Sequence, residues 1–153
     1  MWGAWPMVVS LAAFPAVRAD AGVVDFAFCD TGASVCSHHS SKLAADLGTK
    51  VRALLLVETP SLALRFFRRQ FRLVDGWDSE GLGLVVVVAS LEAESTSGYH
   101  TDVVTAQRLA GPRPRFRVTL MDGSGMVRKR WTRVVTEAEV RREILGGAKH
   151  SAF

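Results

Sequence analysis

Two cysteines and two histidines near the N-terminus are the residues of this sequence best suited to chemistry. They are Cys29, Cys36, His38 and His39, and the 153-residue chain holds two cysteines in all. In an oxidising compartment two such thiols pair in a disulfide, whereas in a reducing one they stay free or bind metal. The compartment therefore decides how this cluster is interpreted.

The cluster allows three interpretations. A structural disulfide would close a short loop and contribute about 2–3 kcal/mol to stability. A redox role would need an activating neighbour, which the sequence does not show beside either cysteine. A metal site is the third, because thiolate and imidazole suit zinc or copper(I), although the spacing matches no established zinc motif. We expect a disulfide between Cys29 and Cys36 and keep a redox or metal-handling role for Cys29, Cys36, His38 and His39 as an alternative.

A stripe of arginines is the second candidate site. Residues 62–74 are predicted to form a helix, and at 3.6 residues per turn Arg65, Arg68, Arg69 and Arg72 share one face, opposite an apolar one. Such a face suits an anionic partner, and it is also the ordinary solvated side of a helix. No aromatic residues interleave with the arginines on that face of the helix, so stacking on single-stranded nucleic acid is not expected.

The elements that position these residues are clearest from residue 51 onward. Two apolar runs flank the arginine-faced helix and indicate buried parallel strands joined by a right-handed crossover. A second helix follows, then an alternating strand, an Asp-Gly turn, a basic strand and a capped helix. The expected ranges are strands at 51–57, 84–88, 115–120 and 126–133 and helices at 62–74, 102–110 and 136–145.

This order, β-α-β-α-β-β-α, predicts an α/β fold of the thioredoxin-like type with a mixed four-stranded sheet. The domain organisation expected from it is a signal peptide at residues 1–19, an N-terminal extension at 20–50, a thioredoxin-like domain at 51–147 and a tail at 148–153. The leader is predicted from the uncharged apolar run before Arg18, with small residues near a cleavage point preceding Asp20.

The stretch 51–147 resembles a small family of bacterial exported proteins of unknown function with a thioredoxin-like domain. The resemblance is carried by an apolar strand that runs into a proline turn, by Arg-Gln on the following helix, and by a strand, an Asp-Gly turn, a basic strand and a capped helix. In this chain the motifs are residues 54–61, Arg68-Arg69-Gln70, residues 116–123, Arg128-Lys129-Arg130 and residues 135–139. The resemblance implies the fold and an exported location, and it brings no catalytic residue.

A working thioredoxin carries two cysteines, two residues apart, where its first helix begins, because the helix N-terminus lowers the pKa of the attacking thiol. The matching position here is Thr59-Pro60-Ser61-Leu62, which contains no thiol. We therefore expect a non-catalytic binding or structural module that needs no cofactor rather than an enzyme.

The composition is that of a folded globular protein, and the compartment is predicted from the leader. Hydrophobic residues make up 48% of the chain, and the net charge of +4 with a pI near 9.6 is mildly basic. We expect a periplasmic or secreted protein with a protein partner and without a membrane span once the leader is removed; a wrong leader prediction would make it cytoplasmic.

Overall fold

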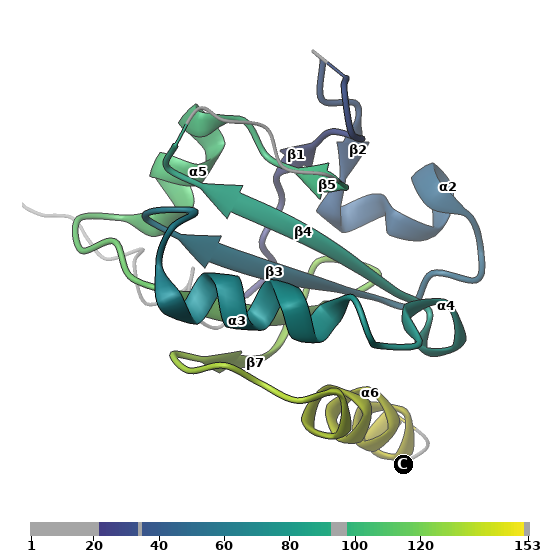
Figure 1. Ribbon diagram of the computed structural model, residues 1–153. Helices are drawn as coiled ribbons and strands as arrows, with labels where there is room; N and C mark the ends of the chain where they lie inside the picture. Colours follow the sequence, from purple (N-terminus) through teal and green to yellow (C-terminus); the bar gives the residue numbers. More distant parts are fainter. Residues whose placement is uncertain (1–21, 34, 93–97, 152–153) are drawn as a thin grey trace, which may run out of the picture.

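The computed structural model of the chain describes residues 22–33, 35–92 and 98–151, and the predicted leader lies outside them. Its centre is a five-stranded sheet in the order β5-β4-β3-β6-β7, which Figure 1 shows with the β3 and β4 arrows side by side. The strands are β3 (Ala53–Thr59), β4 (Leu84–Ser90), β5 (Tyr99–His100), β6 (Arg117–Asp122) and β7 (Val127–Trp131).

The two apolar runs form the parallel pair that the sequence predicts. Leu55 of β3 lies opposite Val86 of β4, and the chain between the two strands forms α3 (Arg65–Val74) and α4 (Ser79–Leu82). Every residue of β3 is buried, because helices or chain segments cover both faces of the sheet. β-branched valines in β4 fit this doubly covered position.

The remaining strands complete the mixed sheet. β6 pairs antiparallel with β3, and β7 pairs antiparallel with β6. The Asp122 carboxylate shapes the turn between β6 and β7 by accepting hydrogen bonds from the backbone N–H groups of Ser124 at 2.9 Å and Met126 at 3.1 Å. The fold class is therefore the predicted one, and the short β5, which pairs in parallel with β4, adds a strand to the four expected.

Two apolar cores lie on the two faces of the sheet. In Figure 1, α3 and α6 (Glu137–Ser151) lie below the sheet, and α5 (Val103–Ala110) and α2 (Leu43–Leu47) lie above it. The first core packs Phe67 of α3 and Val140 of α6 against Leu55 of β3. Leu43 and Ala106 belong to the second core, on the opposite face.

The described residues of the predicted 20–50 extension contribute to the second core. They form β1 (Ala27–Phe28), β2 (His38–His39), the 3₁₀ turn η2 (Ser40–Lys42) and α2. Phe28 is fully buried, and the backbone of the next residue, Cys29, exchanges hydrogen bonds with His100 at 2.7 and 2.9 Å. The extension therefore covers one face of the sheet and also pairs with the β5 edge.

Two helix ends differ from the prediction. α5 begins one residue later than the expected helix at 102–110, because Asp102 caps it by accepting the backbone N–H of Thr105 at 2.7 Å. α6 continues to Ser151 instead of ending at Gly146-Gly147, because a glycine weakens a helix by about 1 kcal/mol without forbidding it. The helix thus includes part of the expected 148–153 tail.

All peptide bonds in the described part of the chain are trans, including those before Pro112 and Pro114. No helix within the described ranges is long and apolar enough to cross a membrane.

Candidate functional site

The loop between β3 and α3 is the position at which thioredoxin-type enzymes carry their thiols. The hydroxyl of Thr59 donates to the carbonyl of Ser61 at 2.6 Å, and the Ser61 hydroxyl accepts the N–H of Ala63 at 3.1 Å. The N–H of Leu62 donates to the Glu92 carboxylate. α3 begins only at Arg65, without a side-chain cap. This loop holds hydroxyls engaged in its own turn and offers no thiol nucleophile.

The two cysteines are bonded to each other, as the disulfide interpretation predicts. Their Cα atoms are 4.2 Å apart, Cys29 is buried and Cys36 is half-buried. The bond closes the loop that follows β1 and returns to β2, so it holds the two short strands together. A sulfur bonded in this way is not a thiolate, and the metal alternative requires thiolates.

An aromatic cluster surrounds the disulfide loop. The His38 ring lies 5.4 Å from the ring of Phe28 and 5.9 Å from that of Tyr99, and its Nε2 lies 3.0 Å from an Asp30 carboxylate oxygen. Burial, and secondarily the negative charge of Asp30, raises the pKa of Tyr99. The contact between the rings of His38 and Tyr99 packs the loop against β5. The side chains of Asp30 and His38 contact each other.

The proposed metal ligands are not gathered around one point. His39 is exposed, its backbone N–H donates to Asp46, and its neighbour His38 is directed to Asp30. In the ranges that the structure describes, no group of three or more His, Cys, Asp or Glu side chains is placed to hold a metal ion.

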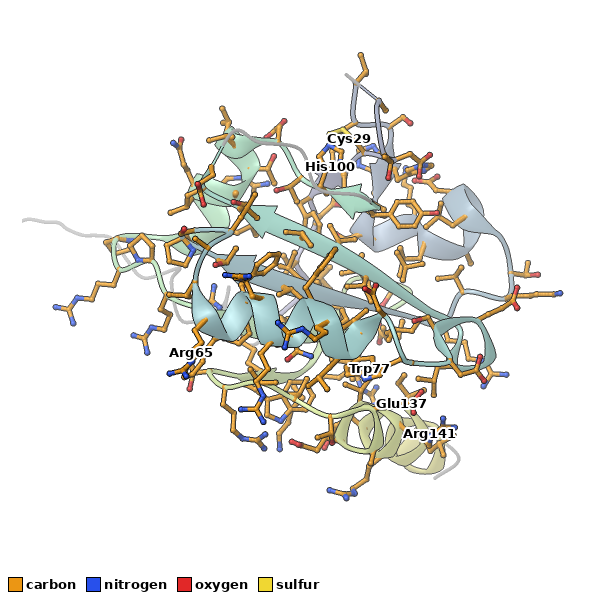
Figure 2. All side chains as sticks on the ribbon, in the orientation of Figure 1. Cys29, Arg65, Trp77, His100, Glu137 and Arg141 are labelled. Carbon is orange, nitrogen blue, oxygen red and sulfur yellow. A yellow bond between two sulfur atoms is a disulfide. The ribbon has the colours of Figure 1, made fainter. Side chains whose placement is uncertain are left out.

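The disulfide and the β3–α3 loop lie on different sides of the sheet. In Figure 2, Cys29 is above the sheet near His100, whereas Arg65 at the start of α3 is below it. The cores agree, because Phe28 beside Cys29 packs in the second core and Phe67 of α3 in the first. The disulfide therefore does not replace the thiols missing from the loop.

The predicted arginine face is assembled on α3. Arg65, Arg68, Arg69 and Arg72 are all exposed and, with Ala63, line a shallow hollow of about 390 Å³. None of the four forms an ion pair with any residue that the structure describes. The apolar face of α3 buries fewer side chains than a fully buried face would, because Phe66 is 49% exposed. Its ring packs edge-on against the ring of Phe116.

A buried ion pair is the feature that sequence reasoning missed. Glu58, 4% exposed near the end of β3, accepts two hydrogen bonds from Arg117 of β6, at 2.8 and 2.9 Å. Arg117 also donates to the Leu109 carbonyl of α5 at 3.0 Å. The sequence signal is a charged residue that directly follows an apolar run, and the expected strand at 51–57 stops one residue before Glu58, which the structure places inside β3.

The order and directions of the strands, with helices on both faces, define a thioredoxin-like fold. Among solved structures, the chain is similar to that of Plasmodium vivax 2-Cys peroxiredoxin in its reduced state, with 9% identity over 69% of this chain and 83% of that one and a TM-score of 0.48. No protein-family model and no curated protein matches the chain.

Proposed function

We propose that the chain is a non-catalytic thioredoxin-like module of an exported protein, of the bacterial family that its sequence resembles, and that it acts by binding. The observation that carries this proposal is the separation of thiols from the catalytic position of the fold. Thr59, Ser61 and Leu62 occupy that position, and both cysteines are bonded to each other on the opposite face. Cys29 is buried, and its disulfide with Cys36 closes a short local loop. Both features are typical of a structural disulfide.

Insulin reduction by dithiothreitol tests the absence of thiol catalysis. The wild-type protein should leave the rate within about twofold of dithiothreitol alone, because no accessible low-pKa thiol is present. Thr59→Cys/Leu62→Cys is the positive control, since it places a thiol pair at the loop that precedes α3. A wild-type rate enhancement that disappears in Cys29→Ser would contradict the proposal and support the redox alternative.

The arginine hollow on α3 favours an anionic partner for this module. Four guanidinium groups on one short helix concentrate positive charge, and Arg in particular forms forked hydrogen bonds to carboxylates, sulfates and phosphates. We infer that an acidic protein surface or an anionic polymer binds here.

Retention on immobilised heparin tests this second proposal. Arg68→Ala/Arg69→Ala should elute at lower salt than the wild type, because each lost cation reduces the number of released counterions. Arg128→Ala/Lys129→Ala removes the same charge from β7, whose residues do not line the hollow, and is the matched control. Equal elution shifts for both variants would show that net charge, rather than this hollow, sets retention.

Export is part of the proposal and is supported by the apolar leader and by the disulfide, which persists in oxidising compartments. Mass spectrometry of the protein recovered from its host decides it. A mature chain that begins near Asp20 with bridged cysteines is expected, and an intact N-terminus with free thiols would contradict export.

A further inference from the structure

A groove crosses the second face of the sheet where no helix of the described residues covers β6 and β7. Two adjoining hollows of about 480 and 440 Å³ are described together as one groove, because they share the lining residues Glu58, Ala110, Pro112, Arg117 and Arg130. Its floor is made by β3, β6 and β7, including Leu56 and Met121. One wall is Val23–Asp25, and the other is the end of α5 with the loop after it.

The groove is strongly cationic. Five arginines and the two carboxylates of Glu58 and Asp25 line it; the arginines are Arg108, Arg113, Arg115, Arg117 and Arg130. Arg113 and Arg115 are exposed at the rim and form no ion pair with a residue that the structure describes. The ion pair with Glu58 already holds the Arg117 side chain in place. Ligand binding in the groove would therefore cost this side chain little conformational entropy.

A buried hydroxyl on the floor is a second, independent sign of a ligand. Thr119 is 2% exposed, lines the groove between Arg117 and Met121, and its Oγ1 has no hydrogen-bond partner in the described structure. Buried hydroxyls in folded proteins nearly always have a partner. A ligand oxygen, directly or through a water molecule, would supply one here.

The position in the fold agrees with a binding site. Glu58 lies near the carboxyl end of the parallel strand β3, and α/β sheets bind ligands beyond the carboxyl ends of such strands. The combined space is in the range of small-molecule sites, which join an apolar lining to a few convergent polar groups.

We propose that this groove binds a small organic anion, with its phosphate or carboxylate head on the rim arginines and a short apolar body against Val23 and Leu109 of the two walls. The site is distinct from the arginine hollow on α3, whose residues do not line it. The proposal therefore does not depend on the partner inferred for that helix.

Calorimetric titration of the purified protein with hexyl phosphate, hexanoate, inorganic phosphate and 1-hexanol tests the site and separates the two head groups. Hexyl phosphate or hexanoate should bind more tightly than inorganic phosphate, which lacks the apolar body, and 1-hexanol should not bind. Arg113→Ala/Arg115→Ala should weaken binding of the better anion by about tenfold, the loss of roughly one charge-assisted hydrogen bond.

Arg68→Ala/Arg69→Ala, which removes equal charge from α3, is the control and should leave this affinity unchanged. Amide resonances of Thr119 and Met121 should shift on titration, which places the ligand on the floor of the groove. Absence of binding by both organic anions, equal binding of 1-hexanol, or equal weakening by the two double variants would overturn the proposal. Loss of heparin retention alone would concern only the α3 hollow.

Discussion

Glu58 and Arg117 illustrate how a single buried charge depends on its partner. The Glu58 side chain is 5% exposed and that of Arg117 29%, and the carboxylate meets the guanidinium through two parallel hydrogen bonds. Burial of either charge without the other is costly, because the low-dielectric interior does not replace the lost hydration. The pair also fixes the end of α5 through the Leu109 carbonyl.

Replacement of Glu58 alone should therefore be more harmful than replacement of both partners. We expect Glu58→Leu to lower the free energy of unfolding by about 3 kcal/mol, since Arg117 then keeps a poorly solvated charge. Glu58→Leu/Arg117→Met should recover a large part of that loss. Urea denaturation of the two single variants and the double variant measures the coupling, and strictly additive losses would argue against it.

Asp102 makes the stability depend on acid pH. The N–H and hydroxyl of Thr105 hold the pKa of Asp102 below its ordinary value of 3.8. A depressed folded pKa contributes stability that is present above the unfolded pKa and is lost as the pH falls through the folded one.

The acid dependence can be tested with Asp102→Asn, which retains a capping oxygen without a titrating group. At pH 7 the two proteins should differ by at most about 0.5 kcal/mol, because Asn and Asp are comparable caps. Between about pH 5 and pH 2 the wild type should lose more stability than Asp102→Asn. Thermal melts across this range provide the comparison, and parallel curves would remove Asp102 as a cause.

At the scale of the elements, the side chain of Gln70 in α3 forms hydrogen bonds to the backbone of the segment before α6. Gln70 is fully buried; its amide oxygen accepts the N–H of Val135 at 2.7 Å, and its amide nitrogen donates to the carbonyl of the same residue at 3.1 Å. Both backbone groups of Val135 thus depend on Gln70, in the manner of a strand partner.

Gln70→Leu should reduce the free energy of unfolding by about 2–3 kcal/mol, because it leaves a buried N–H and a buried carbonyl unsatisfied. Arg69→Leu, at the neighbouring exposed position, should change it by less than about 0.5 kcal/mol and is the matched control. Chemical denaturation distinguishes them. Hydrogen exchange at Val135 should become faster in Gln70→Leu, and unchanged protection there would show that other contacts hold this segment.

The elements also show what could be predicted from sequence. The apolar runs of β3 and β4 and the arginine periodicity of α3 are local patterns, so the parallel pair and the exposed arginine face follow directly from them. Gln70, Thr119 and the Glu58–Arg117 pair could not be found in this way, because residues 58 and 117 are 59 positions apart and meet only through the pairing of β3 with β6. Residues 20–50 are predicted as a separate extension because the family resemblance begins at residue 51, and their two-residue strands β1 and β2 are too short to show a sheet pattern.

At the scale of the whole molecule, residues that precede the predicted domain bury one face of the sheet from solvent. Phe26, Phe28 and Leu43 pack against Leu54 and Val87 in the second core. A protein that began at residue 51 would expose this face, so the functional unit includes the disulfide-linked segment.

Removal of the disulfide should weaken the whole fold rather than abolish it. Cys29→Ala/Cys36→Ala should lose about 2–3 kcal/mol of unfolding free energy, the loop entropy of so short a closure. Urea denaturation of wild-type protein with and without dithiothreitol should give the same difference as the double variant. A much larger loss would indicate that the bond stabilises by more than restricting the unfolded chain.

The seven-residue separation of Cys29 and Cys36 also has a consequence for how the protein is made. Ring closure over so few residues takes place in well under a microsecond, so the two thiols meet long before any distant strands pair. A disulfide-forming catalyst that acts on the emerging chain could form only one disulfide within it, the one between Cys29 and Cys36. No non-native disulfide within the chain would then have to be rearranged. The disulfide that joins β1 to β2 would then form before the strands of the five-stranded sheet have been synthesised.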